Sequence, residues 1–180
     1  MVEQYLHGEF GTAEAVGPYR ASILYAVDRY AAAQKIHGWL TAGSVVISNR
    51  YVASNMAHQG GKIKDAAERQ RFFAWNHELE YTIFQIPQPD LNLILHVPAT
   101  VAHALVDKKS DREYLKGKKR DIHEDDLRHL ADAERAYLEL ARTYPEFCII
   151  ECAAEEKIFS PETIHTMIWE NLQALLTPSQ

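Results

Sequence analysis

The sequence predicts an α/β fold in which helices cover a parallel sheet. Three runs are almost continuously apolar: residues 44–48 (SVVIS), 91–97 (LNLILHV) and 147–152 (FCIIEC). Continuous apolar runs are typical of strands that are buried on both faces, as in parallel sheets. The spacers between the runs are long enough for the crossover helices that parallel strands require. One domain over residues 1–180 therefore accounts for the chain.

Helices are predicted between and around these strands. Apolar residues recur at helical spacing over residues 21–40, and Gly43 ends this stretch. Pro98 begins a helix over residues 98–106, because proline is tolerated in the first turn. A further amphipathic stripe covers residues 127–141. The last helix begins at Ser160-Pro161 and carries its apolar stripe from residue 164 to 175.

Composition and charge indicate a globular protein of the cytoplasm. Hydrophobic residues make up 47% of the chain and charged residues 24%, with a formal net charge of −6. This charge argues against general affinity for nucleic acid or an anionic membrane. No apolar run approaches the roughly 20 residues of a membrane span, and the N-terminus lacks the apolar core of a signal peptide. Cys148 and Cys152 are expected to be reduced core residues, with a redox pair as the alternative.

A compact polar group follows the first predicted strand. Arg50, Ser54, Asn55, His58 and Gln59 come soon after the apolar run ends. Ligands of open α/β sheets bind at the carboxyl ends of the strands, where this group lies. An arginine can hold a phosphate or carboxylate through two parallel hydrogen bonds. The alternative is that Arg50 forms an ion pair with a carboxylate and fixes a loop.

Two more groups are candidates for binding. Residues 108–120 carry seven Lys or Arg against two acidic residues, which predicts an anion site or, alternatively, a solvated helix face or loop. Tyr25 and Arg29 are four residues apart, so they share a helix face on which a planar base could stack. The alternative is a packed tyrosine beside a surface arginine. The histidines and cysteines do not follow a zinc-site pattern, and no metal ligand is assigned from them.

Together these groups resemble the thymidylate kinase family, which has the P-loop nucleoside monophosphate kinase fold. The resemblance rests on "SILYAVDRYA", "GSVVISNRYVASNMAHQG" and "PDLNLILHVPATVA", followed in order by the basic segment and "AERAYLELA". It covers nearly the whole chain. It implies phosphoryl transfer from ATP to dTMP, giving dTDP in nucleotide biosynthesis, with Mg²⁺ and in a homodimer.

The resemblance implies a role for each residue of the acceptor pocket. Tyr25 matches the aromatic residue that stacks on thymine, and Arg29 matches the arginine that bonds the edge of the base. Arg50 matches the arginine that holds the monophosphate. Ser54 and Asn55 match the polar pair that lines the base pocket.

The remaining implied roles concern the sugar, the metal and the lid. His58 stands where many members have a tyrosine near the sugar, which leaves the choice at the 2′ position open. Asn49 stands where an aspartate near Mg²⁺ is common. The segment at about 108–120 resembles the lid over the donor phosphates, with Arg112 and Arg120 as its expected catalytic contacts.

The phosphate-binding motif of the family does not occur in these 180 residues. The motif is Gly-x-x-x-x-Gly-Lys-Ser/Thr, and it cradles the phosphates of ATP. We therefore expect the first strand, the P-loop and the second strand of the family fold to be absent from this chain. A catalytically silent nucleotide-binding module, which keeps only the acceptor pocket, is the alternative to a kinase. A kinase for another deoxynucleotide is the third hypothesis.

Overall fold

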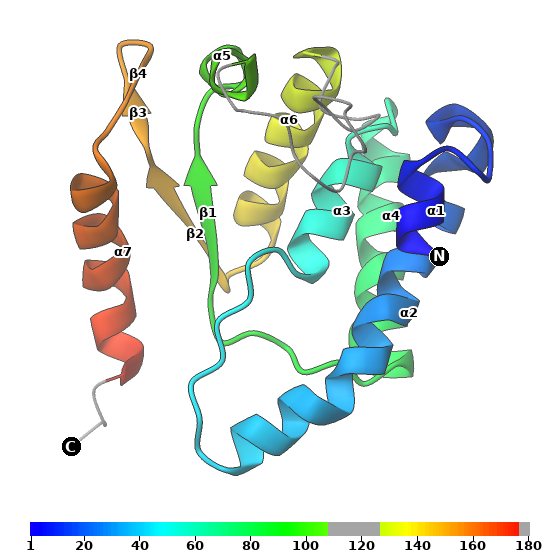
Figure 1. Cartoon of the computed structure of the whole chain (residues 1–180), viewed down its shortest axis with the longest axis horizontal. Helices are drawn as coiled ribbons and strands as arrows, with labels where there is room; N and C mark the ends of the chain where they lie inside the picture. The colour runs from blue at the N-terminus through cyan, green and yellow to red at the C-terminus, as the bar shows by residue number, and fades with distance from the viewer. Residues whose placement is uncertain (108–126, 177–180) are drawn as a thin grey trace.

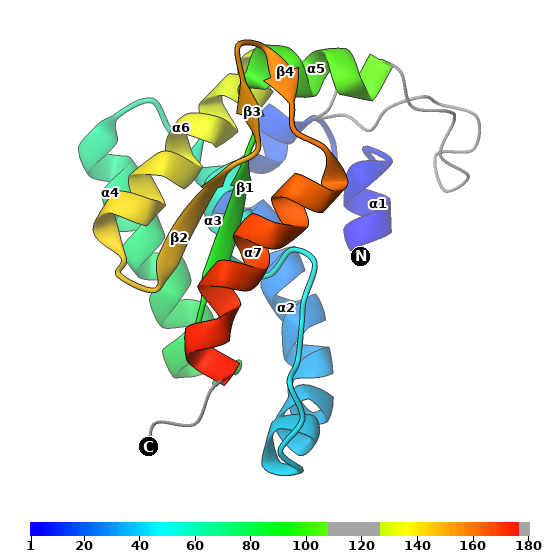
Figure 2. The same ribbon diagram turned by 90° about the vertical axis from the view of Figure 1, so that its left-hand side faces the viewer.

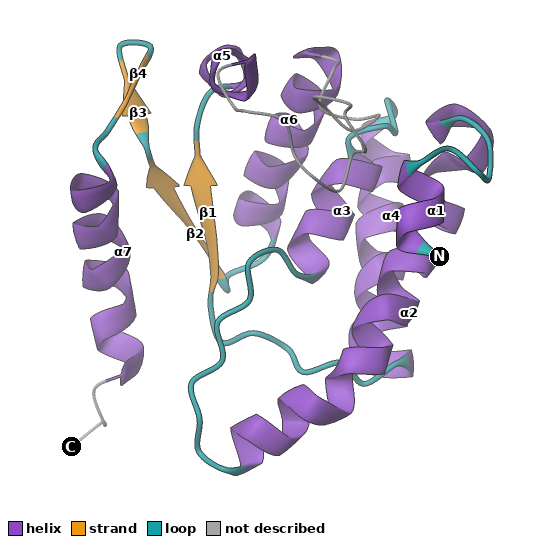
Figure 3. Ribbon diagram, viewed as in Figure 1, coloured by secondary structure: helices purple, strands orange, loops and turns teal. Residues whose placement is uncertain are grey.

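The computed structural model describes residues 1–107 and 127–176 (Figure 1). Helices predominate in this part of the chain, and the strands are few and short (Figure 3). In chain order the elements are α1 (Val2–Leu6), α2 (Ala13–Thr41), α3 (Val52–Gly60), α4 (Ala66–His77), the π-helix η1 (Glu78–Ile83), β1 (Asn92–His96), α5 (Ala99–Asp107), α6 (Leu127–Thr143), β2 (Phe147–Glu151), β3 (Ala153–Ala154), β4 (Lys157–Ile158) and α7 (Pro161–Leu176).

The central sheet pairs β1 with β2 in parallel. The register runs from Asn92 opposite Phe147 to His96 opposite Glu151. α6 packs against β2 from one side and α7 from the other, so helices cover both faces of the sheet (Figures 1 and 2). These two strands and their helical cover confirm the predicted α/β class. Strands β3 and β4 form a separate short antiparallel pair.

The predicted strand over residues 44–48 is wrong. This segment is a loop, and the side chains of Val45 and Ile47 are 69% and 86% exposed. A strand exists through its hydrogen-bond ladder, and among the described residues no strand pairs with this segment. The apolar run therefore identifies residues suited to a sheet interior, but without a partner strand they remain in the loop that leads to α3.

The main core lies among α3, α4 and α6 rather than on the sheet. Val52 and Met56 of α3 pack with Phe72 and Phe73 of α4, and Leu140 of α6 completes the cluster. At the end of α3 the backbone comes very close to the backbone of α6. A Cβ added to Gly61 would lie 2.8 Å from the carbonyl oxygen of Asp132, so only glycine fits there.

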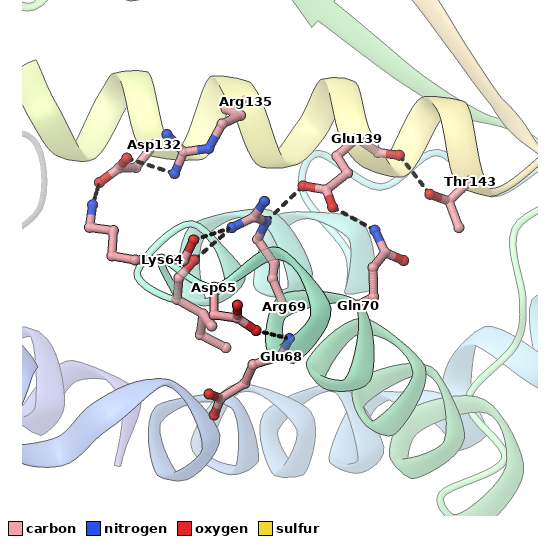
Figure 4. Close-up of polar contacts among 10 residues, drawn as sticks. Lys64, Asp65, Glu68, Arg69, Gln70, Asp132, Arg135, Glu139 and Thr143 are labelled. Carbon is pink, nitrogen blue, oxygen red and sulfur yellow. Dashed lines mark hydrogen bonds and ion pairs between the residues drawn. The ribbon is translucent and has the colours of Figure 1, made fainter.

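Polar contacts hold α6 against the start of α4 (Figure 4). The buried Arg69 donates to Glu139 Oε2 and to the carbonyl oxygen of Ile63, both at 2.7 Å. Gln70 donates to the other oxygen of Glu139 at 2.6 Å. At the other end of the contact, Lys64 forms an ion pair with Asp132 of α6. These bonds fix the position of α6, which lies beside α3.

The long helix α2 positions one wall of the candidate site. Thr12 accepts a hydrogen bond from the backbone of Ala15 and begins the helix. The left-handed Gly17, with φ 73°, breaks the regular helix immediately before Pro18. The rest of α2 confirms the helix predicted over residues 21–40. None of the described helices is long and apolar enough to cross a membrane.

Candidate functional site

A buried carboxylate, Glu80 of η1, joins the two helices that carry the predicted base-binding residues. Its side chain is 0% exposed. Arg29 of α2 donates to it twice, from Nε to Oε2 and from Nη2 to Oε1, both at 2.5 Å. Asn55 of α3 donates from Nδ2 to Oε1 at 3.1 Å. The structure therefore brings Arg29 and Asn55 together around one carboxylate, although they are far apart in the sequence.

In the side-chain amide of Asn55 the nitrogen is hydrogen-bonded, whereas the oxygen has no hydrogen-bond donor among the described residues. Nδ2 also donates to the carbonyl oxygen of Ser22 at 3.2 Å, so the nitrogen has two acceptors. Oδ1 is buried, and no donor among the described residues reaches it. The hydroxyl oxygen of Ser22 is also buried and has no hydrogen-bond partner among the described residues. A buried polar atom without a partner is costly, and such atoms in folded proteins often mark a ligand or water position.

Tyr25 lies one helical turn before Arg29 and is half-buried. Its ring makes an edge-to-face contact with Tyr5 of α1, with ring centroids 6.1 Å apart. Lys62 donates to the hydroxyl of Tyr5 at 3.2 Å and to Gln59 Oε1 at 2.8 Å. Burial lowers the pKa of Lys62 to about 8. Gln59, which belongs to the polar group predicted from sequence, thus binds Lys62 and faces the N-terminal helix.

A second set of predicted residues gathers around Tyr137 of α6. Burial raises the pKa of Tyr137, while a hydrogen bond from Ser54 and the charge of Arg50 oppose the rise. Arg50 is exposed and has φ 65°, a left-handed conformation that is uncommon for a residue with a side chain. Strain of this kind persists where the surroundings impose it and is frequent at ligand sites. Arg50 and Ser54 therefore share one neighbourhood, as expected from the sequence.

His58 faces α6 from the next turn of α3. Its Nδ1 lies 3.3 Å from Nε2 of His129, and the two rings are stacked with centroids 5.5 Å apart. Its ring also meets the ring of Tyr137 edge-on at 5.9 Å. Helix α3 therefore presents Ser54 and His58 to α6, and Asn55 to α2 and η1. Ser54 and Asn55, which the sequence places in the polar group after the predicted strand, lie within helix α3.

Three predicted positions do not contribute described ligands. Asn49 is exposed, and an amide carries no charge for a cation. In the part of the chain that the structure describes, no three His, Cys, Asp or Glu residues are grouped to hold a metal. Asn49 therefore does not supply the carboxylate that a magnesium site ordinarily uses besides the phosphates and water. Arg112 and Arg120, with the basic lid segment, lie outside the described residues.

The sequence reasoning missed Glu80 and Tyr137 as members of the site. Glu80 lies between Leu79 and Tyr81 in a largely apolar stretch, which indicates burial of that stretch. A buried acidic residue requires a cationic partner, and that requirement could have drawn attention to it. Its partner Arg29 is 51 positions away, so no local pattern identifies the pair. Tyr137 falls in the predicted amphipathic stripe over residues 127–141, and its spacing there gives no sign of a place in the site.

Comparison with known proteins identifies the family. A profile of the thymidylate kinase family matches residues 1–167. The chain belongs to the thymidylate kinase family. It is 33% identical over 136 residues to a thymidylate kinase of Mycobacterium tuberculosis and 29% identical over 164 residues to one of Clavibacter michiganensis subsp. michiganensis.

The matches cover most of this chain but less of its relatives. The first covers 76% of this chain and 62% of the Mycobacterium tuberculosis protein, and the second covers 89% and 69%. A solved thymidylate kinase structure from Candida albicans shares the fold, with a TM-score of 0.64 and 20% identity. It covers 97% of this chain, which spans 73% of the Candida albicans chain. The predicted P-loop kinase-like fold class is therefore confirmed.

Proposed function

We propose that this thymidylate kinase family chain binds dTMP as the acceptor of a phosphoryl group from ATP, giving dTDP. The observation that carries the proposal is the buried group of Arg29, Glu80 and Asn55, in which Glu80 fixes the guanidinium of Arg29 and the amide of Asn55 side by side. Arg29 and Asn55 bind the edge of the base. Tyr25 stacks on its face. A stacked aromatic ring contributes about 1–3 kcal/mol per base.

The phosphate and sugar lie toward α6 in this proposal. Arg50 holds the acceptor monophosphate through its guanidinium fork, which suits a phosphate. Ser54 lines the pocket beside it, and His58 lies near the sugar. The homodimer implied by the resemblance and the cytoplasmic location expected from the cysteines belong to the same proposal, together with the absence of nucleic-acid and membrane partners.

Phosphoryl transfer requires mainly positioning and charge neutralisation. The attacking and leaving oxygens must lie in line with the transferred group, and cations must balance the charge that spreads over its oxygens. In our proposal Arg50 orients the attacking phosphate of dTMP, and Arg112 and Arg120 supply positive charge over the donor. Mg²⁺, when bound, would supply positive charge beside the phosphates of ATP, and among the described residues no group of three or more His, Cys, Asp or Glu is placed to hold it.

A second candidate is a nucleotide-binding module without turnover. It keeps the acceptor contacts of Arg29, Glu80 and Asn55, and these 180 residues themselves contain no Gly-x-x-x-x-Gly-Lys-Ser/Thr sequence. Backbone N–H groups and the lysine of that motif hold the β- and γ-phosphates of ATP in this class of kinase. A kinase for another deoxynucleotide remains the third candidate, because His58 replaces the residue expected near the sugar.

Binding and turnover separate these candidates. The purified chain is titrated by calorimetry with dTMP, thymidine and dCMP, and ATP consumption is then followed with dTMP present. Binding of dTMP, with ATP consumption by a version of the chain extended by a P-loop, supports the kinase, and binding without consumption by either version supports the silent module. A chain that binds dCMP more tightly than dTMP supports another deoxynucleotide. Failure to bind all three compounds would refute the acceptor pocket.

A further inference from the structure

The orientation of the Asn55 amide is determined by its neighbours. Nδ2 lies 3.1 Å from Glu80 Oε1 and 3.2 Å from the carbonyl oxygen of Ser22, and both of these atoms can only accept. If the amide were flipped, its oxygen would face two acceptors and both bonds would be lost. The nitrogen therefore stays against Glu80 and Ser22, and Oδ1 is a buried acceptor that no donor among the described residues reaches.

Arg29 is oriented by the same carboxylate. Its Nε and Nη2 are both engaged by Glu80, and the guanidinium is planar and rigid. The Nη1 donors make no hydrogen bond to any other residue in the described parts of the chain. The side chain of Arg29 is 15% exposed, whereas Glu80 is fully buried behind it.

Asn55 Oδ1 and Arg29 Nη1 thus present one acceptor and one group of donors in fixed positions. A uracil or thymine ring presents the complementary pair, since its N3–H donates and its O4 accepts. A cytosine ring presents the reverse pair, since its N3 accepts and its N4 amino group donates. With cytosine in the same place, Asn55 Oδ1 would face the lone pair of N3, and the Arg29 donors would face the N–H groups of N4. Neither pair can form a hydrogen bond.

We propose that Glu80 is a positioning residue that sets the donor and acceptor polarity of the base pocket and thereby selects 4-oxo pyrimidines over 4-amino pyrimidines. It touches no substrate and acts through Asn55 and Arg29. The proposal rests on the proposed function, because it requires the base to lie against these two residues. A carboxylate suits this position because both of its oxygens accept, and together they take three hydrogen bonds from two residues.

Glu80→Gln tests the proposal with almost no change in shape. The amide of glutamine has one oxygen and one nitrogen, so one of its ends must face an Arg29 donor with a donor of its own. Arg29 or Asn55 then loses its fixed orientation. Glu78→Gln is the matched control, because Glu78 lies on the same element, is exposed and loses the same charge.

The readout is the ratio of affinities for dUMP and dCMP, which differ only at the base edge in question. We expect the wild-type chain to bind dTMP, and to bind dUMP more tightly than dCMP. In Glu80→Gln the dUMP to dCMP ratio falls by about tenfold, the value of one hydrogen bond. Glu78→Gln keeps the wild-type ratio. Equal loss of both ligands in Glu80→Gln, or no loss of either, would overturn the proposal.

A second measurement needs no variant of Glu80. In a ¹⁵N-labelled sample, both Nδ2 hydrogens of Asn55 should exchange with solvent at least tenfold more slowly than those of an exposed asparagine; Asn55→Asp identifies the signals by removing them. Rapid exchange would overturn the inference even if Glu80→Gln does not fold. Wild-type chain that binds neither dTMP nor dUMP would refute the proposed function itself, whereas normal binding with an unchanged ratio refutes only the role of Glu80.

Discussion

Replacement of Arg29 by leucine should destabilise the fold strongly, because it leaves a buried carboxylate without its cation. Glu80 is fully buried and receives two of its three hydrogen bonds from Arg29 at 2.5 Å. Only the amide of Asn55 remains as a donor after the substitution. Removal of one partner of a buried ion pair costs about 3–5 kcal/mol. For a domain of this size each kcal/mol lowers Tm by about 2–4 °C, so a decrease of roughly 6–20 °C is expected.

A double variant shows whether the lost partner is the cause. When Arg29→Leu is combined with Glu80→Leu, no unpaired charge remains, and the free energy of unfolding should return to within about 1–2 kcal/mol of wild type. Arg71→Leu on the exposed face of α4 is the control for loss of an arginine. Urea denaturation followed by circular dichroism at pH 7 measures all four proteins. A single variant as stable as wild type, or a double variant no more stable than the single, would refute the reasoning.

Four further predictions follow from the site and the sheet. Arg50→Ala should weaken the binding of dTMP by about 1.5–3 kcal/mol and the binding of thymidine much less, because a charge-assisted contact to the phosphate is lost. Equal losses of binding free energy in calorimetry would show that the role of Arg50 is structural. Tyr25→Ala should lower the affinity for dTMP by about one to two decades, while Tyr25→Phe should change the affinity little, since the face of the ring provides the contact. Burial acts to lower the pKa of His96, but hydrogen bonds to Glu134 at 2.9 Å and Glu151 at 2.6 Å outweigh it and raise the pKa above 6.5. The stability from His96 is therefore complete below about pH 6.5 and lost as pH rises through the raised value, so the unfolding midpoint should fall toward alkaline pH in wild type and not in His96→Gln. The 180-residue chain alone should not consume ATP with dTMP, whereas a version extended by a P-loop should; turnover of the unextended chain at an ordinary kinase rate would contradict this expectation.

The sequence predicts the elements that are determined by local patterns. The structure confirms that the apolar runs over residues 91–97 and 147–152 contain strands, β1 and β2, and that α7 begins at Pro161. Burial and helix initiation depend on residues close in sequence, so local patterns predict them. Ser160 indeed accepts a hydrogen bond from the backbone of Thr163 at 3.2 Å. Residues 44–48 have the same composition as a strand but form a loop, since strand formation depends on a partner elsewhere in the chain.

The candidate site could be predicted only in part for a similar reason. Arg29 and Asn55 were identified from spacing and family resemblance, and the structure brings them together. Glu80, which joins them, could not be found, because its contacts span 51 and 25 positions. The roles assigned to Tyr25, Arg50, Ser54 and His58 stay predictions, and those of Arg112 and Arg120 concern residues outside the described chain.

The exposed loop of residues 44–48 also affects how the protein must be handled. Val45 and Ile47 present apolar side chains to water, and Leu95 of β1 is 51% exposed as well. Among the described strands, β1 has β2 as its only neighbour. Extended apolar segments and open sheet edges of this kind promote self-association at high concentration. Ligand affinities are therefore best measured in dilute solution with light scattering as a check, since clustering of the chains would otherwise obscure the binding of nucleotides.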